Sequence, residues 1–183
     1  LLTGFKNTLF YIVVGTSLVL FTTATGAYVL SKKNVMLKKP IMIYLTITMY
    51  FGGGLIPTYL IVKNTGLMGT VWAMFVPGGV AVSNMIIARN FFENSIPGSL
   101  KEAAEIDGAS KLTIFWRIII PLSRPIMAVM VVFSMVAYWN DWFTGALYMK
   151  GSQAPLPLVL RNILIKISAS ATQASMISGG YAE

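Results

Sequence analysis

The sequence SLKEAAEIDGASKLTIFWRIIIPLSRP, residues 99–125, is a polar stretch between long apolar runs. Ser99, followed three residues later by a glutamate, is the pattern of a capping box and predicts that a short helix starts there. Gly108 can adopt the left-handed conformation that ends a helix. Ser110 is then placed to cap a second helix, which Pro121 ends. The segment therefore predicts two helices joined at Gly108, an elbow on the rim of a membrane domain.

The composition of the chain places it in a membrane. Of its 183 residues, 56% are hydrophobic and 11% are charged. Soluble domains carry about 25% charged residues, so this chain has too little polar surface to stay in water. The net charge of +8 does not indicate nucleic acid, because the basic residues lie at the ends of apolar runs. With no cysteine and no histidine, disulfides and His-based metal or acid–base sites are excluded, and no cofactor is expected.

Four apolar runs are long enough to cross a membrane, since about 20 helical residues span the hydrocarbon core. The predicted fold class is an all-α integral membrane protein, a bundle of four spans in a single transmembrane domain over residues 1–183. The spans are expected at residues 9–30, 41–62, 67–88 and 126–148, with the elbow in a loop over 96–121 and an outer loop over 149–183. Small residues recur in the first span and favour close packing against other helices.

Two of these spans contain helix-breaking residues. Gly52-Gly53-Gly54 interrupts the second, and Pro77-Gly78-Gly79 interrupts the third. Irregular backbone at membrane depth survives only where protein or a water-filled cavity surrounds it. The glycine triplet is therefore expected either to line a translocation path or to make a packing contact. Asn84 either bonds a neighbouring helix or faces the pathway, and a helix–helix bond is the simpler interpretation.

The basic residues predict the orientation of the chain. Loops rich in lysine and arginine lie on the cytoplasmic side. Nine of the 14 basic residues fall in the first loop or around the elbow: Lys32, Lys33, Lys38, Lys39, Arg89, Lys101, Lys111, Arg117 and Arg124. The elbow is therefore predicted to be cytoplasmic, and both ends of the chain are predicted to lie outside.

The fourth span ends in an aromatic and polar cluster, Tyr138, Trp139, Asn140, Asp141 and Trp142. Tryptophan and tyrosine gather at membrane interfaces, which is one interpretation. An acid within a span is costly and usually faces a bundle interior or an aqueous cavity. Rings that stack on sugar C–H faces, beside amide and carboxylate acceptors, also suit a carbohydrate. The cluster is therefore predicted to line the path of a sugar.

The segment after the cluster contains a short amphipathic pattern. Residues 158–167 are expected to form a short helix along the outer surface. Residues 168–180 are small and polar, with little to fix their shape. No Walker motif, internal repeat, paired-carboxylate site or metal-ligand cluster occurs in the sequence.

The elbow resembles the EAA loop of ABC importer permeases. The pattern is filled by Glu102, Ala103, Ala104, Asp107, Gly108, Ala109, Phe115, Ile118 and Pro121. Its form is typical of the carbohydrate-uptake branch, the MalG-like permeases of the polysaccharide or oligosaccharide type. Such permeases have six spans, so the resemblance implies that the first and last are missing here.

The resemblance implies a non-catalytic subunit of the bacterial cytoplasmic membrane that imports a sugar by alternating access. In that family the loop is a coupling helix that docks on a cytoplasmic ATPase, and an outer loop reaches the solute-binding protein. The implied partners are a second permease subunit, an ABC ATPase dimer, a solute-binding protein, membrane lipid and a carbohydrate. The alternatives are a permease for another solute or an ion-coupled secondary transporter, which would need paired ionisable groups within its spans.

Overall fold

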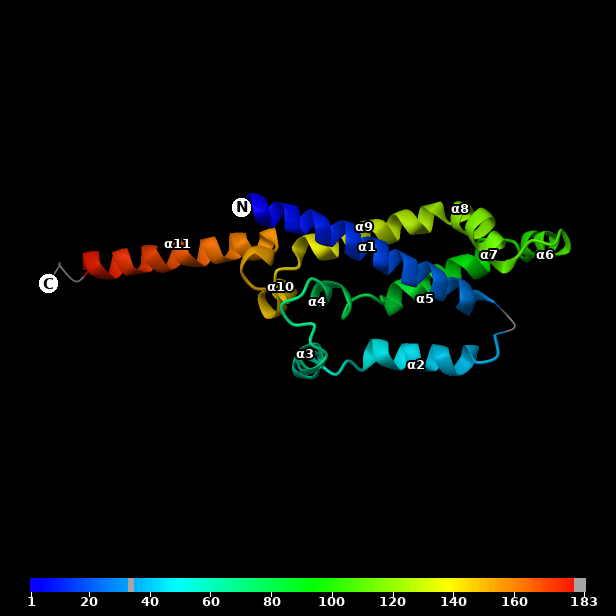
Figure 1. The fold of residues 1–183 in the computed structure, drawn as a ribbon, viewed down its shortest axis with the longest axis horizontal. Helices are drawn as coiled ribbons and strands as arrows, with labels where there is room; N and C mark the ends of the chain where they lie inside the picture. The colour runs from blue at the N-terminus through cyan, green and yellow to red at the C-terminus, as the bar shows by residue number, and fades with distance from the viewer. Residues whose placement is uncertain (33–34, 180–183) are drawn as a thin grey trace.

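A computed structural model describes residues 1–32 and 35–179, without the side chains of residues 172 and 174–179. The described part is helical and contains no strand. The expectation for Lys33 falls outside the described residues. The long helix α1 (Leu2–Ser31) crosses the middle of the molecule, and α5 (Val82–Asn94) and α9 (Arg124–Asn140) pack against it (Figure 1).

Small residues on α1 allow this close packing, as its sequence predicted. A Cβ atom added at Gly15 would lie 2.3 Å from Cζ of Tyr138, and one added at Gly26 would lie 2.6 Å from Cε of Met85. Glycine at these positions lets α9 and α5 approach the helix backbone. α1 is the one helix that is long and apolar enough by itself to cross a membrane in the described part of the chain.

The expected second span is not a continuous helix. Helix α2 (Lys38–Tyr50) ends before the glycine triplet, and α3 (Leu55–Asn64) starts after it at an angle of 112°. Gly54 has a φ of +86°, which an L residue with a side chain rarely adopts. The predicted distortion at the triplet is confirmed, but it is a break rather than a bend. If α2 and α3 are one bent segment, the pair is long and apolar enough to cross.

The expected third span is also divided. The short helix α4 (Trp72–Phe75) and helix α5 are separated by residues 76–81, which include Pro77 and Gly78. Proline removes a backbone donor, and glycine weakens a helix interior, so the run cannot stay helical. Residues 67–88 therefore do not form one helix.

The expected fourth span starts at Arg124, close to the predicted residue 126, but breaks before its predicted end. α9 ends at Asn140, and α10 (Phe143–Tyr148) follows after residues 141–142. The preceding segment, residues 111–122, is bent by 78° relative to α9, and the two together are the third candidate crossing. Length and composition therefore support up to three crossings in the described residues, against the four expected.

The C-terminal segment is more ordered than its sequence suggested. After one 3₁₀ turn (Gly151–Gln153), α11 runs from Leu156 to Gly179, far beyond the short helix expected over 158–167. It projects from the helical body at the end opposite to the elbow (Figure 1). The N-terminal end of α1 anchors its start, because Thr8 Oγ1 accepts a hydrogen bond of 2.8 Å from the Leu156 N–H.

Candidate transport cavity and coupling elbow

The elbow is built as two helices joined at a glycine. Helix α6 (Gly98–Ile106) has Asp107 as its C-cap, and Gly108 has a φ of +77°, in the left-handed region. The Gly108 N–H donates to the Glu105 carbonyl at 3.1 Å, and the next N–H, of Ala109, donates to the Ala104 carbonyl at 2.9 Å. These bonds satisfy the last carbonyls of α6, as a glycine C-cap requires.

The two ends of the elbow differ from the sequence prediction. The capping box at Ser99 is wrong, because α6 starts at Gly98 after Pro97 and has no side-chain cap. Pro97 occupies the N-cap position, and its side chain has no oxygen that could accept a hydrogen bond from a helix N–H. The cap at Ser110 is confirmed, since its Oγ accepts a hydrogen bond of 3.2 Å from the Thr113 N–H at the start of α7 (Lys111–Ile114).

Pro121 does not end the second helix as predicted. A π-helical turn (Phe115–Ile119) follows α7, and Pro121 lies inside the next turn, α8 (Ile120–Leu122). A proline ring clashes with the carbonyl four residues earlier in a regular α-helix, and the wider π turn relieves that clash. The chain changes direction only after Leu122.

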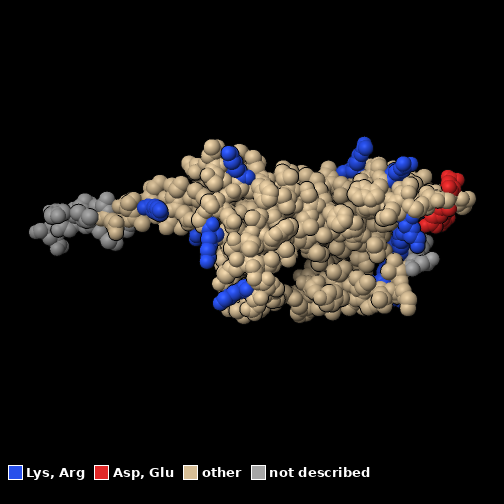
Figure 2. Space-filling view, in the orientation of Figure 1, with Lys and Arg blue, Asp and Glu red and all other residues tan. Residues whose placement is uncertain are grey.

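The solvent-exposed surface of the elbow is both acidic and apolar. Figure 2 shows acidic side chains gathered at the α6 end of the molecule. Glu102 and Asp107 are exposed and form no ion pair with the described residues. Two apolar side chains of the elbow are also exposed: Ile106, next to Asp107, has 87% of its surface exposed, and Leu112 on α7 has 72%. Ala103 is exposed, whereas Ala104 packs against the core.

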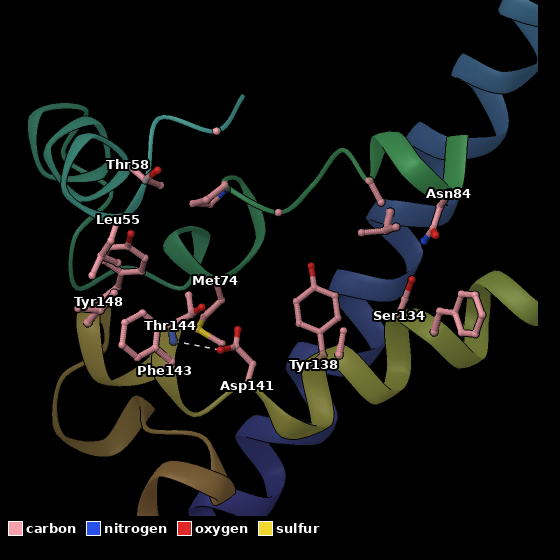
Figure 3. Close-up of a pocket in the computed structure, with 18 of the residues that line it drawn as sticks. Leu55, Thr58, Met74, Asn84, Ser134, Tyr138, Asp141, Phe143, Thr144 and Tyr148 are labelled. Carbon is pink, nitrogen blue, oxygen red and sulfur yellow. Dashed lines mark hydrogen bonds between the residues drawn. The ribbon is translucent and has the colours of Figure 1, made fainter. Parts of the chain in front are cut away.

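A cavity of about 730 Å³ lies in the other half of the molecule, at the helix breaks (Figure 3). Its wall includes the glycine triplet with Leu55 and Thr58, the broken segment around Pro77, and residues of α5, α9 and α10. Backbone that leaves the helix at these positions exposes peptide groups, which a cavity between helices accommodates. The triplet therefore lies on the wall of this cavity, and its place on a translocation path stays a prediction.

The cavity wall combines aromatic rings with a few polar groups. The rings are Phe133, Tyr138, Phe143 and Tyr148, and the polar side chains are Thr58, Asn84, Ser134, Asp141 and Thr144. Asn84 forms no hydrogen bond with the described residues, so the predicted helix–helix bond is absent and its amide faces the cavity. No lysine or arginine lines the cavity within the described part of the chain.

The predicted aromatic and polar cluster is divided by the structure. Tyr138 and Asp141 lie on the cavity wall (Figure 3). Trp139 and Asn140 lie instead on another face, beside a smaller pocket with Ile12, and the Asn140 amide donates to the Val136 carbonyl at 2.9 Å. The Trp142 ring lies under the Arg161 guanidinium of α11, 4.0 Å from its centroid.

Asp141 has a structural partner as well as a place on the wall. Its Oδ1 accepts a hydrogen bond of 3.0 Å from the Thr144 N–H at the start of α10. It lies at a break between two helices, not within a continuous span as predicted. A carboxylate at a helix start satisfies an unpaired N–H and complements the helix dipole. Asp141 therefore fixes the direction of α10 along the cavity.

The same architecture occurs in known transport proteins. Residues 25–180 match the family described as binding-protein-dependent transport system inner membrane component. This chain belongs to that family. LplC of Bacillus subtilis (strain 168) is 43% identical to this permease chain over 165 residues, 90% of the chain and 56% of LplC.

Two further relatives agree. The polygalacturonan/rhamnogalacturonan transport system permease protein YtcP of the same organism is 40% identical over 172 residues, 93% of this chain and 60% of YtcP. A solved bacterial ABC transporter involved in the import of the acidic polysaccharide alginate superposes with a TM-score of 0.82 at 32% identity, covering 87% of this chain and 56% of that chain. The permease chain thus spans 56% to 60% of the length of these proteins.

Sequence reasoning missed several residues that the structure brings to the two sites. Ile106 and Leu112 are single apolar residues with polar neighbours on both sides, so nothing in their pattern separates them from an ordinary helix face. Ser134 lies on the side of α9 that faces the cavity, and Tyr148 reaches the cavity because the chain breaks before α10. The weak signal for that break was Asn140-Asp141, a pair common at helix ends and starts.

Proposed function

We propose that this permease chain belongs to the transmembrane subunit of an ATP-driven importer that moves a sugar or oligosaccharide across the bacterial cytoplasmic membrane. The observation that carries the proposal is the cavity, because three separate helix breaks open onto one space lined by rings and hydrogen-bonding groups. A binding site for a small molecule is concave, largely apolar and fitted with a few polar groups. The wall of this cavity has that composition.

The chemistry of the cavity wall suits a saccharide. Aromatic rings such as Tyr138 and Phe143 offer flat apolar faces to sugar C–H groups, while Asn84, Ser134 and Asp141 offer hydrogen-bond partners to hydroxyls. The names of YtcP and of the alginate importer, both concerned with polysaccharides, support the same solute class. Paired ionisable groups suited to ion coupling are absent from the described wall, because Asp141 is its single charged residue.

The elbow is proposed as the coupling contact with a cytoplasmic ATPase dimer. Exposed acids around a bare apolar side chain are the usual composition of a docking surface, in which a desolvated centre is surrounded by polar groups. Glu102, Ala103, Ala104, Asp107 and Gly108 shape that surface, and Pro121 lies where the elbow returns to the membrane. ATP hydrolysis occurs on the partner, and the permease chain is non-catalytic.

The distribution of charge supports an orientation with the elbow in the cytoplasm and both chain ends outside. Figure 2 shows charged side chains near both ends of the molecule and an uncharged band between them. Most of the basic residues gather at the elbow end, as the positive-inside rule expects. The proposed assembly also contains a second permease subunit, which closes the cavity, and an extracytoplasmic binding protein. The spans then alternate between inward-open and outward-open states.

The proposal is tested by reconstituting the full assembly in proteoliposomes and measuring saccharide uptake driven by ATP. Uptake should require both ATP and the binding protein, and Glu102→Lys should abolish it while membrane insertion persists. Lys63→Glu is the matched control, since it reverses an exposed charge in the last turn of α3, away from the elbow. Normal uptake by Glu102→Lys, with the ATPase still bound, would contradict the coupling assignment.

The orientation has an independent test, because the native chain contains no cysteine. Lys111→Cys and Lys150→Cys place single thiols at the two ends of the molecule. A reagent that cannot cross the membrane should label intact cells at position 150 and not at position 111. Labelling at position 111 alone would reverse the proposed orientation.

A further inference from the structure

One acidic residue joins helix α2 to helix α5 beside the elbow. Glu93, at the end of α5, forms the ion pairs of the described chain: its carboxylate lies 2.8 Å from Lys38 Nζ and 2.7 Å from Arg89 Nη2. Lys38 is the first residue of α2, whereas Arg89 lies one turn before Glu93 on α5. The carboxylate thus holds the start of α2 against the end of α5.

The surrounding cations also bind backbone carbonyls of other elements. Lys38 Nζ donates to the Lys32 carbonyl at 3.2 Å, and Arg89 Nε donates to the Leu30 carbonyl of α1 at 3.2 Å. Lys101 of α6 donates from Nζ to the Phe92 carbonyl, next to Glu93, at 3.1 Å. We call Glu93, Lys38, Arg89 and Lys101 the Glu93 cluster. It connects α1, α2, α5 and the elbow helix α6.

The Glu93 cluster is partly shielded from water, with 27% of the Glu93 side chain and 21% of the Lys38 side chain exposed. Partial burial by itself would raise the pKa of Glu93, but the hydrogen bonds and charges of Lys38 and Arg89 outweigh it and lower that pKa. Burial likewise lowers the pKa of Lys101, and the Glu93 charge opposes that shift. Partly shielded pairs are screened less by salt than exposed ones, so these contacts keep more of their attraction at physiological ionic strength.

Helix α2 depends on this cluster for its position. It has no fully buried residue, and only the partly buried Met42 and Leu45 pack against the core. Its far end leads directly into the glycine triplet, Leu55 and Thr58, which form one side of the cavity wall. At 1.5 Å per residue the 13 residues of α2 span about 20 Å, a rigid rod between the cluster and the cavity.

We propose that Glu93 is a positioning residue that transmits movement of the elbow helix α6 through Lys38 and α2 to the glycine wall of the cavity. The route is continuous: Lys101 ties α6 to the end of α5, Glu93 ties the end of α5 to α2, and α2 carries the displacement to residues 52–54. The flexible glycines let the wall move as α2 moves. This inference rests on the proposed function, because it concerns how the importer couples ATP to the cavity.

The test measures saccharide molecules imported per ATP hydrolysed by the reconstituted assembly. Glu93→Gln and Lys38→Gln keep nearly the same side-chain size and remove the ion pair. Each should lower the ratio by between about twofold and thirtyfold, the range seen for residues that couple distant sites. ATP hydrolysis should persist, since the docking surface of the elbow is unchanged. The double variant should be no worse than the poorer single one, because both remove the same contact.

Two controls make the outcome specific. Lys39→Gln removes the neighbouring charge, which is exposed and forms no bond with the described residues, and should keep the wild-type ratio. Lys38→Arg keeps the ion pair and should keep most of the coupling.

A distance measurement tests the movement itself. Spin labels on Tyr50→Cys and Val132→Cys, both exposed, should show an ATP-dependent change of distance that Glu93→Gln removes.

Three outcomes would overturn the inference. Equal ratios for Lys38→Gln, Glu93→Gln and Lys39→Gln would show that the pair transmits nothing. Loss of assembly in both pair variants would assign the cluster to folding alone. If the wild-type assembly showed no ATP-driven uptake, the proposed function itself would fail. That result differs from failure of the inference alone, in which the wild type imports saccharide and the pair variants keep the wild-type ratio of import to ATP hydrolysis.

Discussion

The exposed Ile106 at the tip of the elbow gives a prediction that separates docking from folding. Its side chain is 87% exposed and is absent from both buried core clusters of this chain. Ile106→Ala should therefore leave the thermal unfolding of the isolated permease chain unchanged. On the ATPase the same side chain would become buried, and its loss would weaken the contact.

The size of that loss follows from the carbons removed. Each buried CH₂ group contributes about 0.8 kcal/mol, and Ile→Ala deletes three carbons, so the upper bound is about 2.4 kcal/mol. With part of the surface already covered, a loss of about 2 kcal/mol remains, which is about thirtyfold in the dissociation constant. Ile106→Leu conserves volume and should cost far less.

The assay is titration of the purified ATPase onto permease held in lipid nanodiscs. Ile56→Ala is the matched control, since that side chain on α3 is 72% exposed but lies away from the elbow. A thirtyfold weaker affinity for Ile106→Ala, with wild-type affinity for Ile56→Ala, is expected. Equal affinities for the two variants, or a lowered unfolding temperature of Ile106→Ala, would refute the reasoning.

Substitutions at four other positions test separate parts of the structure. Gly15→Ala would place a Cβ 2.3 Å from the Tyr138 ring, so it should push the ring into the cavity. The substitution should destabilise the chain by about 1–3 kcal/mol and reduce uptake. A smaller residue at position 138 should restore the stability measured by thermal unfolding. Gly108→Val should cost about 1–3 kcal/mol by forcing a branched residue to a φ of +77°, whereas Gly108→Asn should be tolerated in the same assay. Asp141→Ala should destabilise α10 by about 1 kcal/mol and lower uptake, while Asp141→Asn keeps the hydrogen bond to Thr144 and should unfold like the wild type. The pKa of Glu93 is lowered in the folded chain, so its stabilising effect is complete above the usual carboxyl pKa of about 4.3 and is lost as pH falls through the lowered value. The difference in unfolding temperature between the wild type and Glu93→Gln should therefore shrink below about pH 4. It should not shrink between about pH 5 and 7.

The sequence predicted the parts of the structure that depend on local chemistry. The turn at Gly108, the cap at Ser110 and the break at the glycine triplet each follow from backbone preferences of a few residues. Hydropathy predicted apolar helices but not their continuity, because apolar residues remain apolar on both sides of a break. For that reason residues 67–88 resembled one span, although Pro77 and its glycines divide them.

The cavity could be predicted only in part. The glycine triplet and Asp141 each suggested a path, but no local signal showed that they share a wall with Asn84. That arrangement depends on packing around α1, where Gly15 accepts the Tyr138 ring and turns one side of α9 toward the cavity. The adjacent Trp139 and Asn140 point elsewhere, because successive helical residues are about 100° apart.

The Glu93 cluster was invisible in the sequence for another reason. Lys38 and Glu93 are 55 residues apart, and the charge pattern of the sequence assigned Lys38 to topology and gave Glu93 no role. A single sequence does not show which of nine basic residues on one side pairs with this partly buried acid. Only the fold brings the start of α2 to the end of α5.

The most direct test of the account is to block the cavity chemically. Ser134 lines it from α9 and is buried, and Ser134→Cys adds the single thiol of the chain. In the reconstituted assembly, a small thiol reagent should abolish ATP-driven saccharide uptake while ATP hydrolysis continues, and transported saccharide should slow the labelling. Full uptake by the completely labelled variant would contradict the claim that this cavity is the path of the solute.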